Sequence, residues 1–394
     1  MRPFFRSTSS ARGWAPPLGN GSVGVARRTL LGVLGALPLF WACSGGSAAP
    51  AKSPKKGDAV SAPEPSPIER PALSEEEQAT QRRLEGHLER LSGKIGERHP
   101  GKAWELADSA DYLATELEGM GYALERQGYE AGDGGEVVAQ NLIVTSPGGA
   151  GGEQVIVVGA HYDSPPGDPG RNAGGSGAAA VLELARAFAQ GEHSRTLRFC
   201  LFALGESPHG DGGARGARVY GEGVAKRRAA AEAELAKDAE LKASGALPAA
   251  LPAPAVDRSH VVGVVLLDRL LRFDHGHQDG AEHVVVRLSS GDGSDAYVGA
   301  LADELSTAPL MVERAHIYGS ATESDATYWL SQKVPVVLVH GDLRVQETPA
   351  PGAAPAAPPA ADDLDALTRV VFGVRAALLQ ASGAEVATES PFLQ

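Results

Sequence analysis

The sequence of 394 residues has only two cysteines, no block of basic residues and no long uninterrupted apolar run. The cysteines are Cys43, near the amino-terminal end, and Cys200, inside an apolar stretch from Leu197 to Ala203. If Cys43 is removed or modified, Cys200 has no partner for a disulfide. We therefore expect Cys200 to be a small buried residue of a strand.

Positive charge is also scarce. The chain has 36 Lys and Arg against 49 Asp and Glu, which gives a formal net charge of -13, and the charges are scattered. Binding to nucleic acid needs a basic stripe that neutralises phosphates, so we expect no nucleic-acid partner. The hydrophobic content of 43% is enough to build a sizeable core.

Residues 1–43 are predicted to be an export signal. Arg27 and Arg28 precede an apolar segment, residues 29–42, that is too short and too often interrupted by Gly and Pro to span a membrane. A positive segment followed by a short apolar core is typical of a secretory signal. The paired arginines resemble a twin-arginine signal, and a general secretory signal is the alternative. The protein is therefore expected in the periplasm or cell envelope.

Cys43 directly follows this apolar segment, in a sequence that resembles a bacterial lipoprotein signal. Two outcomes stay open: lipid attachment at Cys43, the only membrane association we expect, or cleavage nearby to give a soluble product. Residues 44–73 are rich in Gly, Ser, Ala, Pro and Lys and have no apolar period, which indicates a flexible linker. The folded domain is then expected at residues 74–394.

Helical and β-branched segments alternate after residue 74. A helix is predicted after the N-cap Ser74, and a second from Ala103 to about Met120, stopped by Gly121. Strands are predicted at residues 141–144, 155–158, 197–203, 261–267, 284–288 and 334–339, with further helices at 176–189, 225–243 and about 363–381. The alternation predicts an α/β fold with a mainly parallel central sheet, helices on both faces and a ligand site at the carboxyl ends of the strands.

Residues suited to chemistry follow several of these strands. His161 and Asp163 stand two apart just past a buried strand, so we expect them to point into one crevice, with the Asp as hydrogen-bond partner of a metal-binding His. Three further segments follow in order: residues 169–177, residues 202–208 with Glu206, and residues 263–268, which end at Asp268.

In order and spacing, these four segments resemble the zinc aminopeptidases of peptidase family M28, which also includes glutaminyl cyclases. The resemblance begins near residues 91–98 and reaches Ser324-Asp325 and the final helix. It implies an aminopeptidase-like three-layer α/β sandwich, zinc as cofactor, and a peptide or protein as substrate or ligand. In that family two zinc ions share a bridging Asp. One zinc has its own His and Asp, and the other its own Glu and His.

The resemblance assigns roles to four retained residues. His161 and Asp268 match the ligands of one zinc, and Asp163 matches the carboxylate that orients the site. Glu206 matches the general base, which takes a proton from metal-bound water.

Three of the five implied ligand positions carry no usable donor. Ala173 stands at the bridging Asp, Ser207 at the second Glu of a Glu-Glu pair, and Leu343 at the late His. One zinc has thus lost all of its ligands, and the other keeps two. Catalytic zinc normally has three protein ligands and a water. Ala326 also follows Asp325 where the family usually has a His.

Three residues could serve as substitute ligands for the lost positions. His209 and Asp211 follow Glu206 on one glycine-rich segment, and His340 closes a predicted strand. A lone histidine on a surface loop is more often simply solvated. His275 and His277, shortly after Asp268, are interpreted as part of a polar loop.

Three functions follow from these observations. The first is an active zinc metalloexopeptidase, which the family implies and the ligand losses oppose. The second, which we favour, is a catalytically silent relative that binds peptides or a partner at the former active site. The third is a mononuclear hydrolase or cyclase that uses the substitute ligands.

Overall fold

A computed structural model of the chain describes residues 66–67, 70–131, 137–206, 215–278, 281–317, 325–341 and 362–383. The predicted export signal and most of the predicted linker lie outside the described residues. So do several residues singled out from the sequence: Cys43, Ser207, His209, Asp211 and Leu343.

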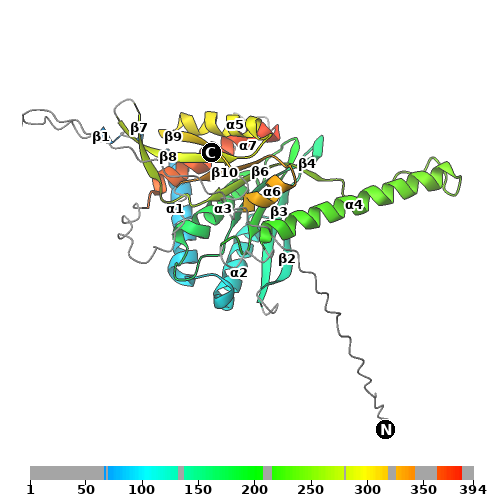
Figure 1. Cartoon of the computed structure of the whole chain (residues 1–394), viewed down its shortest axis with the longest axis horizontal. Helices are drawn as coiled ribbons and strands as arrows, with labels where there is room; N and C mark the ends of the chain where they lie inside the picture. Colours follow the sequence, from blue (N-terminus) through cyan, green and yellow to red (C-terminus); the bar gives the residue numbers. More distant parts are fainter. Residues whose placement is uncertain are drawn as a thin grey trace, which may run out of the picture. The chain divides into compact units, whose positions relative to one another are not determined.

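A mixed sheet forms the centre of the described part (Figure 1), with strand order β1-β8-β10-β6-β4-β5-β3-β2 and with β7 and β9 both paired to β8. The strands are β1 (Ser66–Pro67), β2 (Leu124–Ala131), β3 (Val137–Ser146), β4 (Gly151–His161), β5 (Arg195–Phe202), β6 (His260–Asp268), β7 (Asp274–Gln278), β8 (Ala281–Ser290), β9 (Leu310–His316) and β10 (Val336–His340). The four central strands β10, β6, β4 and β5 are parallel. This confirms the predicted fold class, although antiparallel pairing of β2, β3, β7 and β8 makes the sheet mixed.

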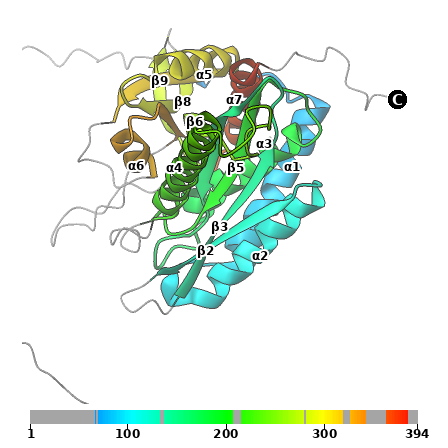
Figure 2. The ribbon, with the colours of Figure 1, turned by 90° about the vertical axis from the view of Figure 1, so that its right-hand side faces the viewer.

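Helices cover both faces of the sheet (Figure 2). They are α1 (Glu75–Leu88), α2 (Ala103–Gly119), α3 (Gly177–Phe188), α4 (Gly216–Ala243), α5 (Asp295–Thr307), α6 (Asp325–Ser331) and α7 (Leu364–Ser382). Helices α1, α2, α3, α5 and α7 share one apolar core with the sheet, whereas α4 and α6 pack on the opposite face in a second core. The predicted three-layer arrangement is therefore confirmed.

Strand β4 shows why the sheet is buried on both faces. Ile156 and Val158 belong to the larger core, and Val155 and Val157 to the smaller one. All four side chains are fully buried. An unbroken apolar run is the sequence pattern of such a strand, because successive side chains point to opposite faces.

Local sequence signals mark the start of α1 and the end of α2, as predicted. Ser74 caps α1 in a reciprocal capping box with Glu77, which satisfies two backbone N–H groups of the first turn. Helix α2 ends at Gly119, and Gly121 has a φ of 91°, a left-handed conformation that glycine adopts at little cost.

Two residues near the end of the predicted linker contact the last helix or the residue before it. The guanidinium of Arg70 donates to Asp363 at 2.6 and 2.9 Å and to Asp365 at 2.9 Å. The carbonyl oxygen of Pro71 accepts a hydrogen bond from Arg369 of α7. Residues 70 and 71 are thus hydrogen-bonded to the start of the last helix.

Two further predictions concern burial. Cys200 is fully buried in β5, and burial raises the pKa of its thiol to about 12, as expected for a small core residue. Helix α4 buries residues mainly in its first half, whereas the second half, within the predicted helix 225–243, is largely exposed. Among the described helices, none has the length and apolar character needed to cross a membrane.

Candidate functional site

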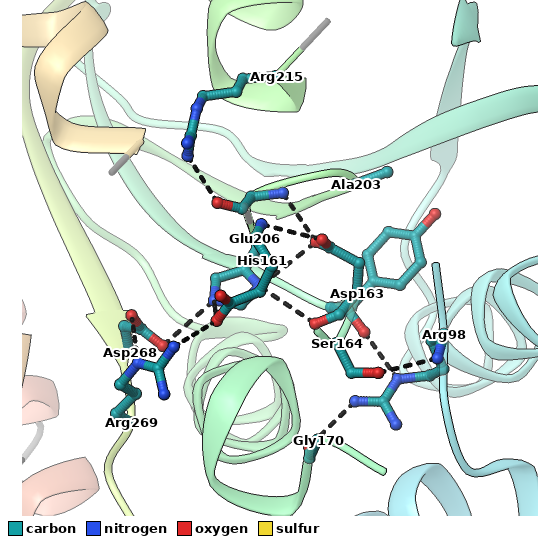
Figure 3. A network of polar contacts seen from close by, with 12 residues as sticks. Arg98, His161, Asp163, Ser164, Gly170, Ala203, Glu206, Arg215, Asp268 and Arg269 are labelled. Carbon is teal, nitrogen blue, oxygen red and sulfur yellow. Dashed lines mark hydrogen bonds and ion pairs between the residues drawn. The ribbon is translucent and has the colours of Figure 1, made fainter. Parts of the chain in front are cut away.

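The four retained residues of the sequence motifs meet at the carboxyl ends of the central strands (Figure 3). His161 ends β4, Asp268 ends β6, and Glu206 follows β5. The Nε2 atom of His161 lies 3.2 Å from Oδ1 of Asp268 and 3.6 Å from Oε1 of Glu206. Because β5, β4 and β6 are parallel neighbours, their carboxyl ends share one edge of the sheet.

Asp163 lies on the other side of the imidazole of His161. Its Oδ1 is 3.3 Å from Nδ1 of His161 and accepts a hydrogen bond from the backbone N–H of Gly205 at 2.8 Å. Its Oδ2 accepts from the backbone N–H of Glu206 at 3.0 Å. The carboxylate is fully buried. It therefore holds Nδ1 of the ring and leaves Nε2 facing Glu206 and Asp268.

A fully buried arginine fixes the backbone below Asp163. The guanidinium of Arg98 donates to five carbonyl oxygens at 2.7 to 3.0 Å; these belong to Leu91, Gly96, Tyr162, Pro169 and Gly170. Burial lowers the pKa of Arg98 to about 10. This arginine lies within the segment that carries the family resemblance, but the sequence did not reveal its role.

The backbone of the glycine-rich segment packs directly against His161 and Asp163. Gly174 has a φ of 76°, and a Cβ placed on it would lie 2.0 Å from the carbonyl oxygen of Asp163 and 3.3 Å from Cε1 of His161. Ala173, the neighbouring residue, is 1% exposed. The position matched to the bridging Asp is thus next to the site and offers only a methyl group.

Arg269 is a site residue that the sequence analysis missed. Its Nη2 donates to Oε1 of Glu206 at 2.7 Å, and its Nε lies 3.7 Å from Oδ2 of Asp268. It directly follows Asp268, so the available signal was a cationic residue placed one position after a candidate metal ligand. Glu206, the candidate general base, is therefore engaged by a guanidinium.

Charges within the site stabilise one another. Burial opposes the charged form of His161, but Asp268 and Asp163 outweigh it and raise the pKa of the imidazole well above its ordinary value. Burial would raise the pKa of Asp163 and of Asp268, yet the hydrogen bonds and charge of His161 hold both below the ordinary value. Burial raises the pKa of Glu206. The carboxylates of Asp268 and Asp163 thus favour the charged form of the His161 imidazole.

His340 and Asp325 are two other residues near the site, and they differ in their hydrogen bonding. His340 is paired in register with Asp268, but its Nε2 lies 2.8 Å from the hydroxyl of Ser289. Asp325, at the start of α6, has an Oδ1 atom without a hydrogen-bond partner among the described residues. Burial raises the pKa of Asp325 to about 6.

The donor atoms fit zinc only in part. His161, Glu206 and Asp268 each offer one ligand atom, and these atoms lie within 4.8 Å of one another; within the described ranges His340 does not join this group. A tetrahedral zinc with bonds of about 2.1 Å holds its ligand atoms about 3.4 Å apart, close to the spacings around Nε2 of His161. However, the residue at the bridging position is Ala173, which has only a methyl side chain, and Arg269 donates a hydrogen bond to the ligand oxygen of Glu206. The described side chains therefore do not fit the two-zinc centre that the family implies.

Both the sequence and the fold are similar to those of known proteins. Residues 141–350 match peptidase family M28. A glutaminyl cyclase from Macrostomum lignano superposes with a TM-score of 0.54 at 16% identity, covering 80% of this chain and 95% of that chain. A glutaminyl cyclase from Porphyromonas gingivalis gives 0.51 at 17% identity, with 77% and 98% covered. A leucine aminopeptidase precursor from Bacteroides thetaiotaomicron gives 0.51 at 15% identity, with 79% and 98% covered. These similar structures share the fold.

Proposed function

The chain belongs to peptidase family M28, and from this premise we propose that it binds the amino-terminal part of a peptide or protein partner without zinc-dependent hydrolysis. One observation carries the proposal. The position matched to the metal-bridging Asp is Ala173, a buried residue that directly precedes Gly174, whose backbone packs against His161 and Asp163. A methyl group cannot coordinate a metal ion.

The loss of this carboxylate removes the means of activating water. Bound zinc lowers the pKa of its water to about 7, far below that of free water, so a carboxylate such as Glu206 deprotonates only the bound water efficiently. Glu206 also accepts a hydrogen bond from Arg269. The residues retained in the site therefore support ligand binding better than hydrolysis.

Carboxylates that remain partly exposed favour a cationic ligand group. The side chains of Glu206 and Asp268 are 13% and 19% exposed, whereas Asp163 is closed off by the protein. A carboxylate accepts charge-assisted hydrogen bonds from an ammonium group such as the free amino terminus of a peptide. Similar structures that carry the name aminopeptidase support a peptide as the ligand class.

Two measurements on the purified chain test the proposal. We expect no turnover of amino-acid 4-nitroanilides, with or without added zinc, above that of Glu206→Gln. We also expect fluorescently labelled peptides with a free amino terminus to bind about 10- to 100-fold more tightly than their acetylated forms, because one charge-assisted hydrogen bond is worth about 1.5–3 kcal/mol. Wild-type turnover that is abolished in Glu206→Gln would show that the protein is an active hydrolase. Equal affinity for the free and the acetylated peptides would show that the site does not recognise an amino terminus.

A second candidate is a zinc aminopeptidase with a single rebuilt metal site. The observation that favours it is the spacing of the donor atoms of His161, Glu206 and Asp268. It requires about one tightly bound zinc per wild-type chain, which elemental analysis of the purified protein measures directly. Zinc well below one per chain would exclude this candidate.

Export and lipid attachment are proposed from residues 1–43 and Cys43. We expect cell fractionation to place the protein in the envelope. If Cys43 carries a lipid, Cys43→Ser should release the protein from membranes; if cleavage occurs nearby, the wild-type protein should already be soluble. Full-length chain in the cytosol would contradict export.

A further inference from the structure

Arg269 is held in an unusual backbone conformation at the end of β6. Its φ is 50°, in the left-handed region that residues other than glycine rarely adopt. The following turn is tied to the glycine-rich segment, because the N–H of Leu270 donates to Ser176 Oγ at 2.8 Å and the N–H of Leu271 donates to Asn172 Oδ1 at 3.0 Å. The tertiary structure thus imposes the conformation that turns the side chain of Arg269 towards the site.

The guanidinium lies against two of the three candidate metal ligands. It donates to Oε1 of Glu206 at 2.7 Å, the oxygen that lies 3.6 Å from Nε2 of His161. Its Nε is 3.7 Å from Oδ2 of Asp268. The side chain of Arg269 is 18% exposed, so solvent screens this charge only in part.

We propose that the guanidinium of Arg269 takes the place of a metal charge and keeps divalent zinc from the His161–Glu206–Asp268 group, which binds one zinc ion once that guanidinium is removed. The inference rests on the proposed function only in that both expect a wild-type chain without tightly bound zinc.

Two physical effects exclude the metal. A divalent ion bound to Glu206 would stand within a few ångströms of a permanently charged guanidinium, and like charges at that distance repel strongly in a partly buried site. The metal would also have to displace the hydrogen bond between Arg269 and Glu206. Removal of the guanidinium leaves two carboxylates without this compensating cation beside an imidazole, a mixed donor set that suits zinc.

Zinc titration by calorimetry and the visible spectrum of the cobalt(II) form test the proposal. In Arg269→Gly, which suits the left-handed backbone, we expect zinc to bind at one per chain and about 100-fold more tightly than in wild type. Cobalt should give the intense visible bands of a four-coordinate site. Arg269→Gln removes the charge at similar length and is a second variant in case the glycine variant does not fold.

Two controls separate this effect from a general loss of positive charge. Arg272→Ala removes an arginine from the same turn, but this arginine pairs with Asp362 and should leave zinc affinity unchanged. The double variant Arg269→Gly/Asp268→Asn should lose most of the gained affinity, because it removes one donor.

Folded Arg269→Gly and Arg269→Gln, checked by circular dichroism, that bind zinc no better than wild type would overturn the proposal. Wild-type protein that binds zinc as tightly as both variants would overturn it as well. Failure of the variants to gain zinc leaves the proposed peptide binding intact, and failure of peptide binding leaves the zinc result unaffected.

Discussion

The two sides of His161 are stabilised in different ways. On one side, Asp163 is fully buried and accepts hydrogen bonds from two backbone N–H groups, while Arg98 donates to five backbone carbonyls beneath it. On the other side, Glu206 and Asp268 are partly exposed and are compensated by side-chain charges, those of His161 and Arg269. Hydrogen bonds to backbone groups are fixed by the fold, whereas a compensating side-chain charge can be replaced by a different cation. The two sides of His161 therefore depend on different parts of the structure.

The largest effect is expected from Arg98→Met. Loss of the guanidinium leaves several buried carbonyls without hydrogen bonds, so the free energy of unfolding should fall by about 3–5 kcal/mol. Urea unfolding followed by circular dichroism measures the change. Arg90→Met is the matched control, because Arg90 pairs with Asp108 on the exposed surface and should cost less than about 1 kcal/mol. Equal losses of stability in Arg98→Met and Arg90→Met would show that the buried hydrogen bonds of Arg98 do not stabilise the fold.

The same substitution on each side should give unequal results. Asp163→Asn places an amide against two backbone donors and should cost about 2–3 kcal/mol, whereas Asp268→Asn changes a partly exposed carboxylate compensated by side-chain charges and should cost less. The folded-state pKa of Asp163 is lowered, so its contribution is present above the unfolded pKa of about 3.9 and is lost as pH falls through the folded value. The deficit of Asp163→Asn should therefore shrink in acid. A deficit that stays constant from pH 7 to pH 3 would contradict this assignment.

The smallest effect is expected at Asp325, which is buried like Asp163 but has one oxygen without a hydrogen bond among the described residues. Its pKa is raised to about 6, so the folded state binds the proton more tightly than the unfolded chain, and stability falls as pH rises from about 4 to 6. Asp325→Asn should stabilise the protein by about 1–2 kcal/mol above pH 6 and by almost nothing near pH 4. Thermal melting at both pH values measures the gain. Destabilisation at pH 7 would show that the ionised carboxylate has a stabilising partner.

The sequence by itself determined the class of fold and where to look for a site. The unbroken apolar run of β4 predicts a strand buried on both faces, and the N-cap Ser74 predicts the start of α1, because these patterns depend on neighbours in the chain. The motif positions also predicted the meeting of His161, Asp163, Glu206 and Asp268, whose chemical roles stay predictions. The alanine at position 173 was visible without any structure.

Only the tertiary structure decided what surrounds these residues. Arg269 and Glu206 are 63 positions apart and meet because β5 and β6 both flank β4. The contacts of Arg98 and the buried carboxylate of Asp325 likewise depend on segments that no local pattern connects. A sequence motif reports which donors are present. Whether a neighbouring cation or a buried backbone group engages them is set by packing between distant segments, because hydrogen bonds and charge interactions act over a few ångströms in space.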